Sequence, residues 1–128
     1  MKKILNAAAV ALAAATFFAA GAAKFAGAPP IVEVFDRFGL PAWFMLVTGA
    51  VEIVGSVALI APSSRARFFG AMLLCTTMIV GAGFHFAFDP PAAAIPAIFL
   101  ACATAAIAAR NASGGMPRVQ EQDGPSSR

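Results

Sequence analysis

The sequence predicts an all-α polytopic membrane protein, built as a four-transmembrane-helix bundle with a short interfacial amphipathic helix between helices 1 and 2. Its 128 residues are 60% hydrophobic and only 12% charged, and their mean hydropathy is +0.82. A soluble domain of this length cannot cover so much apolar surface with so few polar residues, whereas a bilayer solvates that surface directly. Four separate apolar runs also have the length that a helix needs to cross a membrane.

The four runs cover residues 4–23, 42–61, 68–88 and 92–109. Each has about 20 residues, and at about 1.5 Å per residue a helix of that length spans a hydrocarbon core of about 30 Å. The runs lack the alternating polarity of β-barrel strands, and backbone groups in lipid must pair within their own segment, so each run is expected to be a helix. Asp89, followed by two prolines, is predicted to be the N-cap of the last helix. Pro96 is expected to kink that helix or to be accommodated by its neighbours.

Between the first two runs, the segment "PPIVEVFDRFGLP" is predicted to form a short amphipathic helix in the outer membrane interface. A functional alternative is that it covers the outer mouth of the bundle. Trp43, just after this segment, fits an interfacial anchor. The amphipathic pattern sets four apolar residues at helical spacing against three charged ones: Ile31, Val34, Phe35 and Phe38 against Glu33, Asp36 and Arg37.

The positions of Lys and Arg predict that both termini lie in the cytoplasm. In that orientation seven of the nine basic residues are on the inner side, and only Lys24 and Arg37 are on the outer side, as the positive-inside rule favours. One alternative stays open, because the N-terminal segment also has the basic start, apolar middle and small-residue end of a secretory signal peptide. Cleavage near Ala22 would leave three spans. The apolar run is about 20 residues, longer than the usual 7 to 15 of a signal core, which favours a retained helix.

Residues 1–110 are thus expected to form one transmembrane domain, and residues 111–128, rich in Ser, Gly, Gln, Pro and charges, a disordered cytoplasmic tail. The net charge is +3, but the basic residues form no stripe or patch, which argues against nucleic acid as a partner. The two cysteines, Cys75 and Cys102, lie inside apolar runs without CxxC or metal-ligand spacing. They are interpreted as small packing residues, and no metal site is predicted.

Glu52 is the only charged residue of the stretch "TGAVEIVG" and lies near the middle of the second run. A charge at the bilayer centre costs roughly 2.5 to 3.5 kcal/mol on insertion scales, so a residue kept there usually faces the bundle or a cavity. Thr48, Glu52 and Ser56 share one helical face, with Gly49 and Gly55 beside it. Small residues on that face allow close approach, and hydroxyls can hydrogen-bond across. Glu52 is therefore predicted to point inward, as a functional residue or as a structural hydrogen-bonding group.

His85 and Lys24 are the other candidate functional residues. Thr77, Gly81 and His85 form a similar stripe on the third run, and His85 is expected near its outer end, at the depth of Lys24. Glu52 then lies roughly 10 Å deeper, so direct contact with His85 is not expected without a water chain or a bound ligand. His85 is interpreted either as a site residue or as a histidine that bonds head groups or water. Lys24 is interpreted mainly as a helix-end residue that extends to the interface.

With these residues in place, the chain resembles the DoxX-like family of small four-helix membrane proteins. The resemblance implies a bundle in the bacterial cytoplasmic (inner) membrane, with Lys24, Glu52 and His85 at positions where such proteins carry similar polar residues. Relatives are linked to thiosulfate oxidation with quinone as acceptor and to membrane complexes that handle thiol or oxidative stress. Four motifs carry the resemblance: "AAGAAKFAGAPP", "VFDRFGLPAWFM", "TGAVEIVGSVALIAP" and "GAGFHFAF".

Two hypotheses of function follow. The first is an accessory or redox-linked membrane component, associated with quinone or thiol chemistry, in contact with the bilayer, a membrane or redox protein partner, or further copies of itself. The sequence contains no flavin, haem or metal motif, so intrinsic catalytic activity and a cofactor other than a quinone are not expected. The alternative is a small proton-coupled transporter in which Glu52 takes up and releases a proton. Because four spans offer little pathway, that alternative requires an oligomer.

Overall fold

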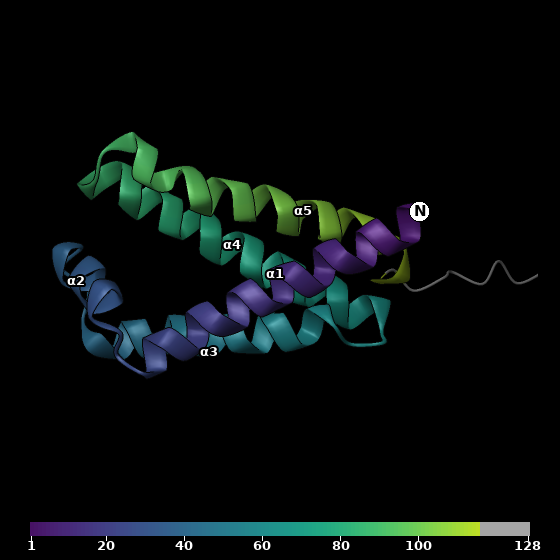
Figure 1. The fold of residues 1–128 in the computed structure, drawn as a ribbon, viewed down its shortest axis with the longest axis horizontal. Coiled ribbons are helices and arrows are strands. Elements are labelled where there is room, and N and C mark those ends of the chain that lie inside the picture. Colours follow the sequence, from purple (N-terminus) through teal and green to yellow (C-terminus); the bar gives the residue numbers. More distant parts are fainter. Residues whose placement is uncertain (116–128) are drawn as a thin grey trace, which may run out of the picture.

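The computed structural model describes residues 1–115, and this part of the chain is helical with short connections and contains no strand (Figure 1). Four helices are long and apolar enough to cross a membrane: α1, α3, α4 and the segment Pro91–Ser113 of η1 and α5. The predicted all-α, four-span architecture is therefore confirmed, together with a short helix between the first two spans. The elements are α1 (Lys2–Phe25), α2 (Pro29–Arg37), α3 (Ala42–Leu59), α4 (Ser64–Phe88), the 3-10 turn η1 (Pro91–Ala94) and α5 (Ile95–Gly115).

The long helices form two antiparallel pairs, α1 with α3 and α4 with α5, and the pairs are joined mainly where α3 packs on α4 (Figure 1). α2 lies across one end of the bundle, which we call the α2 end. All four long helices contribute to one apolar core, which includes Phe17, Leu59, Leu74 and Ile107. Many other large apolar side chains are exposed on the outer surface of the bundle. Such a surface suits a hydrocarbon environment.

Glycines set the closest helix contacts. A Cβ added at Gly21 would lie 2.7 Å from the carbonyl oxygen of Gly49, so the backbones of α1 and α3 touch at this point. A Cβ at Gly55 would lie 2.6 Å from Cγ of Leu74, so the side chain of Leu74 on α4 packs directly on the backbone of α3. The small-residue face predicted around Glu52 is therefore the packing face of α3. Gly81 differs, because a Cβ there would meet nothing within 4 Å.

The hydroxyl groups on that face were expected to hydrogen-bond across helices, but they bond within α3 instead. Thr48 Oγ1 donates to the carbonyl oxygen of Met45 at 2.8 Å, and Ser56 Oγ donates to that of Ile53 at 2.7 Å. Both bonds return to the hydroxyl's own helix, where a carbonyl three residues back is always within reach. The two hydroxyls therefore bond within α3 and do not join α3 to a neighbouring helix.

Several boundaries differ from those predicted. α4 begins at Ser64 rather than at residue 68, because Ser63 caps it by accepting a hydrogen bond from the backbone N–H of Ala66 at 3.4 Å. Asp89 is not an N-cap: it follows the last turn of α4, and η1 is preceded by Pro90. Pro96 lies in the first turn of α5, where its missing N–H removes no helix bond, so no kink is required.

The C-terminal helix continues past the expected limit of the transmembrane domain. α5 extends to Gly115, so residues 111–115 of the predicted tail are helical. The rest of the predicted disordered tail, residues 116–128, lies outside the described residues. Nδ2 of Asn111, the first residue of that predicted tail, donates to the carbonyl oxygen of Ile107 at 2.8 Å within the same helix.

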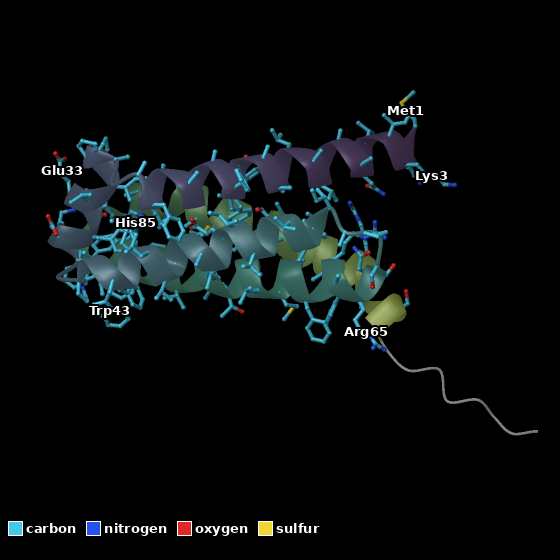
Figure 2. All side chains as sticks on the ribbon, turned by 90° about the horizontal axis from the view of Figure 1, so that it is seen from below. Met1, Lys3, Glu33, Trp43, Arg65 and His85 are labelled. Atoms are coloured by element: carbon cyan, nitrogen blue, oxygen red, sulfur yellow. The ribbon has the colours of Figure 1, made fainter. Side chains whose placement is uncertain are left out.

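Apart from Lys24 and Glu52, the charged side chains within residues 1–115 lie at the two ends of the bundle. Figure 2 shows Glu33, His85 and Trp43 at the α2 end, and Lys3 and Arg65 at the opposite end. We call this opposite end the basic end. Most Lys and Arg residues therefore lie at one end of the bundle, as their uneven distribution along the chain predicts.

Candidate functional site

Lys24 and Glu52 form an ion pair inside the bundle. Nζ of Lys24 donates to Oε2 of Glu52 at 2.7 Å, and the two side chains are only 12% and 4% exposed. Glu52 is thus buried, as its helix face predicts. Lys24 is not the interface-seeking residue that was expected, since its charge is turned into the bundle. A buried pair of this kind joins α1 directly to α3.

The contact of Gly21 with Gly49 explains how the pair forms. Lys24 and Glu52 each lie three residues beyond their glycine on antiparallel helices, so they are separated by about 9 Å along the axis. Helical Cβ atoms tilt toward the N-terminus, so the two side chains lean toward each other. A Cβ added at Gly49 would lie 3.1 Å from Cβ of Lys24. Glycine therefore leaves the space through which the lysine chain reaches the carboxylate.

The pair retains hydrogen-bonding capacity. Among the residues that the structure describes, Lys24 makes one side-chain hydrogen bond, and Glu52 accepts through Oε2 alone. An ammonium group has three donors and a carboxylate has two acceptor oxygens, so both groups can bind one further polar atom. In an apolar bundle such capacity is costly to leave unused, which makes the pair a candidate contact for a polar ligand group.

A second polar cluster lies at the α2 end. Arg37, the last residue of α2, donates from Nε to Oδ1 of Asp89 at 2.7 Å and from Nη2 to Oδ2 at 3.3 Å. His85 lies 2.7 Å from the same Oδ2 through Nδ1. A carboxylate only accepts, so Nδ1 of His85 carries the proton and Nε2 is left for another partner. We call Arg37, His85 and Asp89 the end clasp, because they tie α2 to the end of α4.

Aromatic rings support the end clasp. Phe38, the residue after α2, is buried, and its ring stacks on Phe84 with centroids 5.5 Å apart. It meets His85 edge-on at 5.2 Å and Phe88 at 5.6 Å. The rings hold the imidazole beside Asp89 and cover part of it from solvent. The apolar face of the segment that includes α2 is therefore turned toward α4.

Bidentate contact with Arg37 lowers the pKa of Asp89 below its usual value. Desolvation of the carboxyl opposes this effect, and the hydrogen bond from His85 adds to it. Asp89 therefore stays ionised to lower pH in the folded protein than in an unfolded chain. Its contribution to stability is present above the ordinary pKa of an aspartate, about 4, and is lost as pH falls through the lowered value.

Acidification should therefore release α2 before the rest of the bundle. As pH falls through the lowered pKa of Asp89, protonation of the carboxylate removes the charge that holds Arg37, so amide hydrogen exchange in residues 29–38 is expected to rise. In an Asp89→Asn variant this exchange should already be fast at neutral pH and should change little on acidification. Glu33→Gln is the matched control, because Glu33 is an exposed carboxylate on α2, the helix whose exchange is measured. Equal acid response in the Asp89→Asn and control proteins would contradict the assignment.

Glu52 and His85, two of the candidate residues from the sequence, belong to separate clusters. No hydrogen bond joins them within residues 1–115, in agreement with the depth difference expected. Sequence reasoning missed Arg37 and Asp89 as partners. The i,i+4 spacing of His85 and Asp89 was a usable signal, whereas the approach of Arg37 depends on how α2 folds back and has no signal in the local sequence.

The two cysteines belong to neither polar cluster. Cys75 and Cys102 are free thiols that line a shallow apolar groove between α4 and α5. Sγ of Cys75 lies 3.5 Å from the carbonyl oxygen of Ala101. In the described part of the chain, no three His, Cys, Asp or Glu side chains gather closely enough to hold a metal ion.

The fold and the two polar clusters define a small four-helix membrane protein with charged groups between its helices. Comparison with protein families gives a match to the DoxX-like family over residues 8–106, and the chain belongs to that family. The match includes α3 and α4 in full, most of the first and last spans, the Lys24–Glu52 pair and the end clasp. Neither the search of curated proteins nor the search of solved structures found a match.

Proposed function

We propose that this protein is an accessory, redox-linked membrane component whose Lys24–Glu52 pair binds the polar head of a quinone-like ligand. The spare hydrogen-bonding capacity of the buried pair is the observation that supports this most. A quinone offers carbonyl oxygens on an apolar ring, and Lys24 has donors that meet such an acceptor in apolar surroundings. The ligand supplies the electron chemistry, and the chain binds and orients it.

The features of the pair fit this role. The side chain of Lys24 is 12% exposed, so part of the lysine is accessible from outside the bundle. Glu52 fixes the position of that group and balances its charge in a low-dielectric environment. The surrounding helix faces are apolar or small, which suits a lipid-soluble ring. Binding of this kind requires no nucleophile or metal from the chain, in keeping with an accessory role.

The proposed location is the bacterial cytoplasmic membrane with both termini in the cytoplasm. The basic end carries five Lys and Arg residues within residues 1–115, whereas the α2 end carries Arg37, which is paired with Asp89. The positive-inside rule favours the basic end on the cytoplasmic side. The end clasp would then lie on the outer side of the membrane, and the ion pair would lie toward the middle of the bilayer.

Labelling with a photoreactive azidoquinone in mild detergent tests the proposed function. Label is expected in the peptides that contain residues 17–25 and 45–56. In the double variant Lys24→Met/Glu52→Met it should fall by about tenfold or more, as loss of one hydrogen bond to a charged group predicts. The double variant avoids leaving one buried charge unpaired. Lys3→Met, an exposed change on the same helix, should label like wild type. Undiminished labelling of the double variant would contradict the proposal.

A further inference from the structure

A third polar site lies at the basic end, away from both the Lys24–Glu52 pair and the end clasp. There the start of α1, the end of α3, the start of α4 and the last turns of α5 surround a groove of about 440 Å³. Polar side chains line part of the groove and apolar ones line the rest. The lining residues used below are Asn6, Val10, Ala11, Ile60, Arg67 and Arg110.

Neutral partners hold both arginines in place. Nη1 of Arg110 donates to Oδ1 of Asn6 at 2.8 Å. Nε of Arg67 donates to Oδ1 of Asn111 at 3.2 Å, and its Nη2 lies 3.5 Å from Oγ of Ser64. These bonds orient the guanidinium groups but leave their charge uncompensated. A guanidinium has five donors, so each arginine retains several for a further acceptor.

No carboxylate of the described residues lies at this end. Three of the four acidic residues within residues 1–115 are Glu33, Asp36 and Asp89, which belong to the α2 end, and the fourth, Glu52, is paired with Lys24. Figure 2 shows the opposite ends of the molecule, with Glu33 at one and Lys3 and Arg65 at the other. The groove is therefore a cationic site that needs an anion from outside these residues.

We propose that this groove binds an anionic membrane phospholipid. The head-group phosphate accepts hydrogen bonds from Arg67 and Arg110, since the guanidinium fork matches phosphate oxygens. An acyl chain lies along Val10, Ala11 and Ile60, apolar lining residues that are at least partly exposed. The groove is at the end of the spanning helices, the depth at which basic pockets meet lipid head groups. α1 and α5 share few contacts of their own, so a lipid in this groove would also join the two helix pairs.

Native mass spectrometry of the full-length protein in mild detergent tests this site. The full chain is needed because the carboxylates of Glu121 and Asp123 lie outside the described residues. Dioleoylphosphatidylglycerol is expected to bind more tightly than dioleoylphosphatidylcholine. The Kd of dioleoylphosphatidylglycerol for the double variant Arg67→Gln/Arg110→Gln should be about tenfold or more above that for wild type, because charged hydrogen bonds to the phosphate are lost.

Arg65→Gln is the matched control. It removes the same charge from the same end, but Arg65 is exposed and does not line the groove. The Kd of phosphatidylglycerol for this control should stay within about threefold of the wild-type value. That result distinguishes binding in a specific groove from general attraction to a basic surface. Arg110→Gln alone provides a second variant if the double variant is poorly folded, because Arg110 is exposed.

Three results would overturn the assignment. Equal affinity for the two lipids would mean that the head-group charge is not recognised. An effect of Arg65→Gln as large as that of the double variant would mean that no particular pocket is involved. Inorganic phosphate that binds as tightly as phosphatidylglycerol would mean that the apolar half of the groove contributes nothing and that the ligand is not a lipid.

Discussion

Replacing Lys24 by methionine is expected to lower the free energy of unfolding by about 3 kcal/mol, because it leaves the carboxylate of Glu52 buried without its partner. Methionine keeps most of the volume of the lysine chain, so packing against Gly49 is largely preserved. The loss should be visible as a shift in reversible unfolding from mixed micelles. It should be accompanied by separation of α1 from α3.

Lys3→Met provides the comparison for this change. Lys3 is on the same helix but is exposed at the basic end, and surface substitutions of this kind usually change stability by no more than about 0.5 kcal/mol. The two variants lose the same charge from the same helix. If both unfold like wild type, the ion pair contributes nothing to the bundle, and the geometry described for the site is wrong.

Gly21→Ala is expected to destabilise the bundle by about 1 to 3 kcal/mol, the usual range for overpacking. The added methyl group would lie 2.7 Å from the carbonyl oxygen of Gly49, a backbone atom that cannot rotate away. α1 must therefore move off α3, which also lengthens the reach from Lys24 to Glu52. The variant should lose both unfolding free energy and azidoquinone labelling.

Gly83→Ala is the control for this substitution. A Cβ at Gly83 meets nothing within 4 Å, and alanine is favoured over glycine in a helix interior by roughly 0.5 to 1 kcal/mol. Gly83→Ala should therefore unfold like wild type or slightly later. Equal loss of stability in the two alanine variants would show that glycine flexibility, and not the contact of α1 with α3, is what the bundle needs.

The two polar clusters act at different places in the same architecture. The Lys24–Glu52 pair joins α1 to α3 within one helix pair. The end clasp joins Arg37, in the segment between α1 and α3, to Asp89 after α4, and so connects the two helix pairs at the α2 end. Gly55 and Leu74 connect them within the bundle. α1, α2, α3 and α4 are thus each held by at least one specific contact in addition to apolar packing.

The sequence was sufficient to predict the spans and the inward face of α3. Span length is set by the thickness of a bilayer, and the small residues around Glu52 allow only a packing face. The carboxylate of Glu52 is buried where that face predicts, with 3% of the residue exposed. These predictions depend on residues within one helix, and they therefore did not require knowledge of how helices pair.

The partner of Glu52 was missed because depth was counted from residue number alone. Along the axis Lys24 and Glu52 are well separated, but their side chains tilt toward each other only when the two helices are antiparallel and adjacent. Asp89 was assigned to the wrong helix end for a related reason. Its carboxylate could cap a helix or bind a cation, and only the fold brings Arg37 close enough to decide between them.

A double-mutant cycle on Lys24 and Glu52 tests the central claim most directly, which is that these two residues form a buried pair on which the α1–α3 contact and the proposed ligand site depend. Unfolding free energies of wild type, Lys24→Met, Glu52→Gln and the double variant give the coupling between the two side chains. We predict a coupling of about 1.5 kcal/mol or more, with the double variant more stable than Lys24→Met alone. Effects that add to within about 0.5 kcal/mol would contradict the account.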